Sequence, residues 1–132
     1  MKSAKPVFIL LVCLLFVSTG CNGKSEPVGD LAGVVTVDGE PLGDCSVVLF
    51  NQEKQFSITA RVDSQGNYSI KDILTGVYKV AVRQQPQNFP TGEDFEHSIE
   101  VLDQIPVRYR TLEQSDLSFE LAEGDNEFNV VL

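Results

Sequence analysis

The stretch of sequence that decides the fold is FSITARVDSQGNYSI, residues 56–70. From Phe56 to Val62, apolar residues occupy every second position and polar residues lie between them. A period of two places all the apolar side chains on one face, which is typical of a half-buried β-strand. The polar segment that follows contains Gly66, which suits a tight turn, and a second strand-like run begins at Tyr68.

The same pattern recurs along the chain, and no segment shows a sustained helical stripe. Further strands are predicted where apolar residues alternate or cluster, at 31–37, 46–50, 78–82, 117–121 and 128–132. Asp38-Gly39 is a strong hairpin signal, and residues 123–126 are predicted to be the turn between the last two strands. Several short strands separated by turns predict an all-β fold, a single antiparallel β-sandwich of about seven strands over residues 31–132.

Residues 84–114 break this rhythm, with prolines at positions 86, 90 and 106 and scattered charges. A segment of this length inside a compact domain is usually functional or disordered. We predict a long surface loop near 84–114 that contains one short turn of helix.

Residues 1–20 have the three-part order of a secretory signal peptide. Lys2 and Lys5 are followed by an apolar run of 11 residues, 7–17, and then by small residues up to Gly20. Such a run is too short to span a bilayer, which needs about 20 residues. We therefore predict a cleaved signal peptide over residues 1–20.

Cys21 directly follows these small residues, and residues 17–21 (VSTGC) resemble a lipobox, with Ser18 where Leu is usual. The resemblance implies a cysteine that is acylated before the leader is cleaved. Residues 21–30 are mostly polar and contain Gly and Pro, which predicts a lipidated cysteine and a flexible tether. We expect a lipoprotein anchored in the cell envelope. By resemblance to Gram-negative sorting, Asn22 in place of Asp after the cysteine permits the outer membrane if the host is Gram-negative. The alternative is a soluble secreted protein.

The three cysteines divide between the leader, the anchor and the domain. Cys13 leaves with the leader, and Cys45 remains unpaired if Cys21 is acylated. Cys45 is then predicted to be a small apolar residue buried beside a strand. If Cys21 is not acylated, a Cys21–Cys45 disulfide stays open as an alternative.

The charge balance is acidic, with 19 acidic residues, 10 basic residues and a formal net charge of −9. Because Lys2 and Lys5 belong to the leader, the remainder carries 8 basic and 19 acidic residues, a formal −11. A surface of this sign repels phosphate backbones, so nucleic acid is not an expected partner.

Residues with catalytic or metal-binding chemistry are few. His97 is the single histidine, so no second histidine is present for a zinc site. Nothing in the sequence places a serine and an acid beside it as a catalytic triad. Residues 63–67 loosely resemble a calcium loop but are better explained as a hairpin turn. The acidic group Glu93, Asp94 and Glu96 is at most a weak cation site. We predict no enzyme activity, no cofactor and no metal.

Arg108, Tyr109 and Arg110 form the one candidate ligand contact, because two cations flank an aromatic ring. Such a group can bind a sugar, a carboxylate or an acidic polymer. Alternatively, these residues pair with nearby acids and pin the long loop to the sandwich.

Three motifs together resemble the carboxypeptidase regulatory-like domain, and the later part of the chain resembles small bacterial lipoproteins that carry this one domain. The motifs are Gly33-x-Val35-x-Val37-Asp38-Gly39-x-Pro41-Leu42, Ala60-x-Val62-Asp63-x-x-Gly66-x-Tyr68-x-Ile70, and Leu74-x-x-Gly76-x-Tyr78-x-Val80. The resemblance implies a transthyretin-like (prealbumin-like) β-sandwich that is an accessory module without a catalytic set. The predicted function is a non-catalytic structural or interaction module that binds a partner protein or an envelope polymer. A carbohydrate-binding module is the alternative, although the chain has no Trp.

Overall fold

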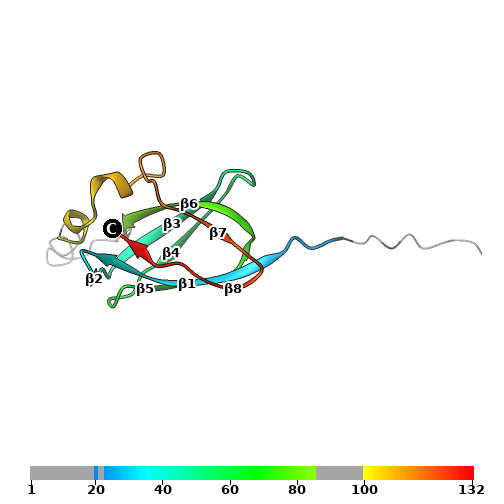
Figure 1. Ribbon diagram of the computed structural model, residues 1–132, viewed down its shortest axis with the longest axis horizontal. Coiled ribbons are helices and arrows are strands. Elements are labelled where there is room, and N and C mark those ends of the chain that lie inside the picture. Colours follow the sequence, from blue (N-terminus) through cyan, green and yellow to red (C-terminus); the bar gives the residue numbers. More distant parts are fainter. Residues whose placement is uncertain (1–19, 21–22, 86–99) are drawn as a thin grey trace, which may run out of the picture.

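The computed structural model describes residues 20, 23–85 and 100–132. In this part of the chain, nine strands form two sheets that pack as a sandwich (Figure 1). The first sheet contains β1 (Val28–Val37), β2 (Glu40–Pro41), β5 (Asn67–Leu74), β8 (Gly124–Glu127) and β9 (Val130–Val131). The second sheet contains β3 (Cys45–Asn51), β4 (Phe56–Arg61), β6 (Gly76–Gln84) and β7 (Ser118–Leu121), in the order β4-β3-β6-β7. The predicted all-β sandwich is thus confirmed.

The core lies between the two sheets and is filled by the alternating apolar residues that the sequence pattern identified. Tyr78 and Leu49 are completely buried there, and the Tyr78 hydroxyl donates to the Leu74 carbonyl at 2.7 Å. Burying a large apolar side chain stabilises a fold by about 1.5–3 kcal/mol. The largest other buried side chains are Leu31, Ile73, Ile105 and Leu121.

Strand β3 is buried on both faces. Val47 and Leu49 face the core, while Ser46 and Val48 on the opposite face are only 2% and 6% exposed. This matches the apolar character of residues 46–50, and β3 lies between β4 and β6 in its sheet.

The first sheet is not purely antiparallel, which corrects the prediction. β1 pairs antiparallel with β5 on one side and parallel with β8 and β9 on the other. Residues 123–126 were predicted to be a turn, but residues 124–127 form β8, whose backbone pairs with β1. Two glycines of β1 permit this close approach: a Cβ at Gly33 would lie 1.9 Å from the Phe128 oxygen, and one at Gly29 would lie 2.3 Å from the Ala122 oxygen.

The tether is also shorter than predicted. β1 begins at Val28, so residues 28–30 belong to the sheet and not to the flexible segment 21–30. Val28 pairs with Leu74, and Asp30 pairs with Asp125. These backbone partners come from distant parts of the chain, so the local composition did not reveal them.

The C-terminal part of the segment 84–114, predicted to be a surface loop, contains regular structure. Residues 100–104 are helical, and the 3₁₀-helix η2 (Val107–Tyr109) follows. Val101, Ile105 and Tyr109 are at most 5% exposed and belong to the hydrophobic core cluster. This apolar spacing of four residues was hidden by the surrounding prolines and charges.

The domain has two distinct ends, as Figure 1 shows. The chain enters β1 at one end, which we call the tether end, where Lys54 in the turn after β3 lies 3.6 Å from Glu26. The strand registers place the starts of β3 and β5 and the ends of β4 and β6 at the opposite end, which we call the distal end. No helix among the described residues is long and apolar enough to cross a membrane.

Candidate functional site

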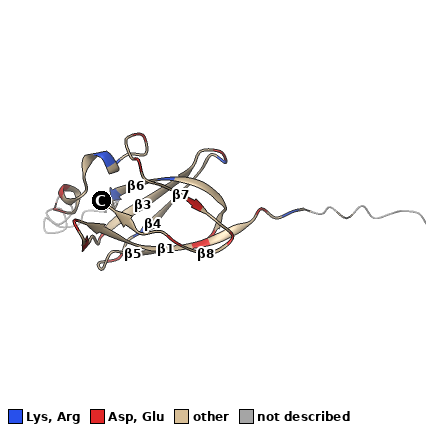
Figure 2. Cartoon of the chain, viewed as in Figure 1, with Lys and Arg blue, Asp and Glu red and all other residues tan. Residues whose placement is uncertain are grey.

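All four arginines of the chain lie toward the distal end. Arg61 is the last residue of β4, Arg83 is the penultimate residue of β6, and Arg108 and Arg110 lie in and directly after η2. Arg83 donates through Nε to the Arg110 carbonyl at 3.3 Å, which ties the two groups together. An otherwise acidic molecule therefore carries its arginines in one region (Figure 2).

The predicted ligand contact Arg108-Tyr109-Arg110 has clear structural roles. Tyr109 is 5% exposed, and the Arg108 guanidinium lies 4.5 Å from its ring centre and donates to its hydroxyl. Arg110 donates to the carbonyls of Ile105 and Leu102, both at 2.8 Å. These bonds join residues 102–110 to one another, and the segment is tied to the sandwich by the bond from Arg83 and by the buried ring of Tyr109. Within the described residues, neither Arg108 nor Arg110 forms an ion pair with an acid. A contact with a ligand stays a prediction, and Arg108 is the exposed member of the three.

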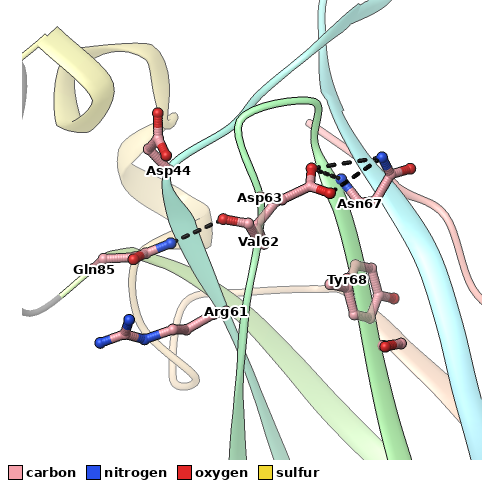
Figure 3. A pocket seen from close by; sticks show the side chains of 8 residues that line it. Asp44, Arg61, Val62, Asp63, Asn67, Tyr68 and Gln85 are labelled. Atoms are coloured by element: carbon pink, nitrogen blue, oxygen red, sulfur yellow. Dashed lines mark hydrogen bonds between the residues drawn. The ribbon is translucent and has the colours of Figure 1, made fainter.

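An open groove of about 490 Å³ lies at the distal end between the edges of β4 and β5 (Figure 3). Its lining is mainly polar and includes Arg61, Asp44 and Ser69. Gln85 closes one side by donating to the carbonyls of Cys45 and Val62, both at 2.9 Å. In Figure 3 the Arg61 side chain points away from Tyr68, toward the side on which Gln85 lies.

The turn between β4 and β5 forms another wall of this groove. The Asp63 carboxylate accepts hydrogen bonds from the backbone amides of Gln65 and Asn67, both at 2.9 Å. These bonds, that of Asn67 first, lower the pKa of Asp63 from its ordinary value. The predicted turn at residues 63–67 is thus confirmed, but it is not a hairpin turn, because β4 and β5 belong to different sheets. The Asp63 carboxylate is already occupied by the turn.

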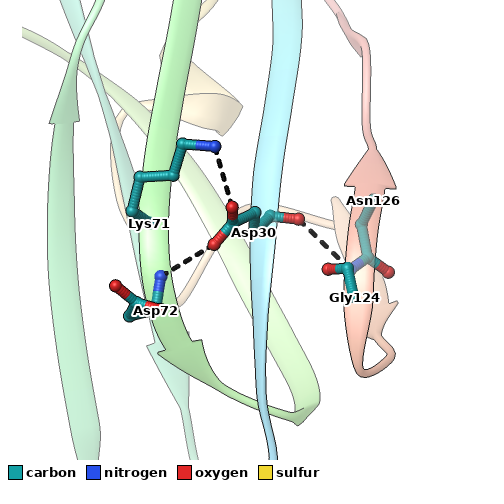
Figure 4. Close-up of polar contacts among 5 residues, drawn as sticks. All are labelled: Asp30, Lys71, Asp72, Gly124 and Asn126. Atoms are coloured by element: carbon teal, nitrogen blue, oxygen red, sulfur yellow. Dashed lines mark hydrogen bonds and ion pairs between the residues drawn. The ribbon is translucent and has the colours of Figure 1, made fainter.

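A group of polar contacts on the first sheet surrounds Asp30. Asp30 on β1 accepts from Lys71 at 2.8 Å and from the Asp72 amide at 3.0 Å (Figure 4). The Asn126 side chain donates to the Asp30 carbonyl at 3.2 Å, so β1 is clamped to both of its neighbours. The bond from Lys71, followed by that from Asp72, lowers the pKa of Asp30. These contacts stabilise the sheet and already use the Asp30 carboxylate.

Cys45 is completely buried and is a free thiol, as predicted for a small apolar residue. Burial raises its pKa to about 12, so the reactive thiolate is scarce at neutral pH. Cys21 lies outside the described residues, so the alternative of a Cys21–Cys45 disulfide stays open.

Metal and catalytic chemistry find no support in the part of the chain that the structure describes. No group of three or more His, Cys, Asp or Glu side chains is placed there to hold a metal ion. His97 and the acidic group Glu93, Asp94 and Glu96 lie outside the described residues.

Sequence reasoning missed Ser46, Arg61 and Arg83, which lie side by side. Ser46 pairs with Arg61 of β4 on one side and with Arg83 of β6 on the other. Each residue fits its own strand pattern, so no local signal marks it. Only the strand order and register, which join positions far apart in the sequence, would have brought these residues together.

The two-sheet architecture defines a transthyretin-like β-sandwich, the class that the sequence predicted. Residues 30–93 match the model of one family of this class, the carboxypeptidase regulatory-like domain. The predicted resemblance to that family is therefore confirmed. No curated protein matches the chain.

Two solved structures are similar to the chain. A DUF3823 family protein from Parabacteroides merdae is 18% identical with a TM-score of 0.49, and the match covers 81% of this chain and 46% of that one. A DUF3823 family protein from Bacteroides ovatus is 20% identical with a TM-score of 0.45, and the match covers 80% of this chain and 44% of that one. This chain thus spans less than half the length of either protein.

Proposed function

We propose that the protein is a non-catalytic interaction module, anchored in the cell envelope through acylated Cys21, that presents its distal end to an acidic partner protein or envelope polymer. The observation that carries this proposal is the polarity of the domain. The chain enters at the tether end, whereas the arginines and the groove between β4 and β5 lie toward the distal end.

The reach of the tether supports this orientation. Residues 22–27 separate Cys21 from β1 and span roughly 20 Å when fully extended. The 10-residue strand β1 adds roughly 33 Å along the same direction. A lipid anchor at Cys21 would therefore hold the turn after β3 near the bilayer and leave the distal end exposed to the envelope space.

Charge supports an acidic partner. With a net charge of −9, most of the surface repels acidic macromolecules. The distal arginines are the exception, and guanidinium groups recognise carboxylates and phosphates through paired hydrogen bonds.

The carbohydrate-binding alternative has less support. Sugar sites commonly use exposed aromatic rings, but within the described ranges every Tyr is buried and every Phe is half-buried. The large apolar side chains exposed there are Val28, Val77, Val107 and Val131.

The anchor is tested by the intact mass of the full chain purified from membranes of cells that express it. We expect the mass of residues 21–132 plus acyl groups, and the same acyl addition in a Cys45→Ala variant. A mass without lipid and two hydrogens lighter than free thiols predict would contradict the anchor and indicate a Cys21–Cys45 disulfide.

The orientation is tested by site-specific photo-crosslinking in intact cells. A photoreactive residue at Gln65, in the distal turn, is compared with one at Gln52, in the tether-end turn; both positions are exposed. We expect partner adducts from position 65 that are absent from position 52. Equal adducts, or adducts from position 52 alone, would reject the distal end as the binding end.

A further inference from the structure

Arg61, Ser46 and Arg83 form a row across the outer face of the second sheet. Ser46 on β3 is the direct cross-strand partner of Arg61 on β4 and of Arg83 on β6. Directly paired residues share a face, and each strand is spaced about 4.8 Å from the next. The two arginines therefore start roughly 10 Å apart, with the serine between them.

No described acid neutralises the guanidinium groups of this row. Among the described residues, Arg61 makes no side-chain hydrogen bond or ion pair, and Arg83 uses only its Nε, on the Arg110 carbonyl. The ion pairs among the described residues involve Lys54 and Lys71 instead. Strands β3, β4 and β6 contain no Asp or Glu, so the sheet brings no acid to the row. Two like charges held this close repel each other and do not stabilise the fold.

The hydroxyl of Ser46 adds a second, independent observation. Ser46 is 2% exposed, and its Oγ is buried without a hydrogen-bond partner. Buried hydroxyls in proteins are nearly always paired, so an unpaired one needs an explanation. A group that accepts a hydrogen bond between the two arginines would supply that partner.

We infer that Arg61, Ser46 and Arg83 bind an oxyanion, the carboxylate or phosphate group of a larger partner. Guanidinium groups only donate hydrogen bonds, and the serine hydroxyl can donate a further one, so the row selects a ligand that only accepts. This inference rests on the proposed function, because it names the chemical group that the distal end would recognise.

The surroundings restrict the ligand to a single charged group. Asp44 and Asp63 line the groove beside Arg61, and Glu100 and Asp103 lie in the helical segment before η2. Of the partners proposed above, a densely charged polymer would meet these carboxylates as well as the arginines and be repelled, which favours a partner whose acidic groups are spaced apart. A single oxyanion on a partner can bind between the two arginines without repulsion from these carboxylates.

The test is an NMR titration of the isotope-labelled full chain in a non-ionic detergent, with inorganic phosphate and separately with acetate, replacing chloride at constant ionic strength. We expect saturable shifts in the backbone amides of Ser46, Arg61 and Arg83. Comparison of the two anions identifies which oxyanion the row prefers.

Variants separate the row from general charge effects. Arg61→Gln and Ser46→Ala should each weaken binding of the preferred anion, Arg61→Gln by about tenfold. The matched control is Lys79→Gln, which removes one positive charge from the same face of β6 outside the row. Because the exposed Arg61 side chain makes no hydrogen bond or ion pair with the described residues, its replacement should leave the amide spectrum dispersed.

No saturable shift with either anion, or equal affinity in the Arg61→Gln and Lys79→Gln variants, would overturn the inference. Neither result would affect the acyl mass at Cys21, so failure of this site and failure of the proposed anchor are distinguishable.

Discussion

At the scale of single residues, Gly33 shows how one missing side chain organises the first sheet. Its hydrogen allows the Phe128 carbonyl to approach β1 closely, and the same carbonyl accepts from the Tyr68 hydroxyl. The sequence pattern marked Gly33 as part of a family motif. It could not give the reason, because Phe128 is distant in the chain. Cys45, by contrast, was predicted correctly from its own apolar neighbourhood.

Gly33→Ala should destabilise the domain by about 1–3 kcal/mol, because the new Cβ would overlap the Phe128 carbonyl and push the C-terminal strand away. Urea denaturation followed by circular dichroism measures the effect. Gly23→Ala is the matched control, since nothing lies within 4 Å of a Cβ there. Equal stability of the two variants would contradict this prediction, because it would mean that the backbone at Phe128 shifts without loss of free energy.

At the scale of elements, the turn between β4 and β5 was predictable because all its determinants are local. Asp63 captures two amides of the turn, and Gly66 adopts a φ of +85°. β8 was not predictable in the same way: residues 124–127 carry turn-forming residues, and only their pairing with β1 makes them a strand. Tertiary context overrides local propensity there.

Asp63→Ala should lower the free energy of unfolding, because two amide hydrogen bonds lose their acceptor. The strands themselves should persist. Asp116→Ala is the comparison, since Asp116 is exposed and its side chain makes no hydrogen bond. A loss of stability that is no greater at Asp63 than at Asp116 would refute the role of the turn.

At the scale of the whole molecule, the alternating pattern was enough to predict two sheets around one core. It could not predict the parallel pairing of β1 with β8 and β9, or the row of Arg61, Ser46 and Arg83, because both depend on which strands become neighbours. From the sequence, a candidate site could be predicted only at Arg108 to Arg110, because three suitable residues are adjacent in the chain there.

The stability of the whole domain should fall in acid. The pKa values of Asp30 and Asp63 lie below their ordinary value of 3.8 in the folded state, so the unfolded chain binds protons first as pH falls. Their contribution is present above that value and is lost as pH drops through the folded pKa values.

Denaturation by urea at pH 7 and at pH 3 measures this loss. Asp30→Asn should reduce the difference in unfolding free energy between the two pH values, whereas Asp116→Asn should leave it unchanged. An identical pH dependence in both variants would contradict the role of the Asp30–Lys71 pair.

The position of β1 has a mechanical consequence. A pull on the tether would act along the first strand, which is bonded to β5 on one edge and to β8 and β9 on the other. Such a load shears both ladders at once, so many hydrogen bonds share the force instead of breaking one after another as in a peeling hairpin. If Cys21 carries the proposed lipid and a partner grips the opposite end, the domain would act as a stiff link between the two.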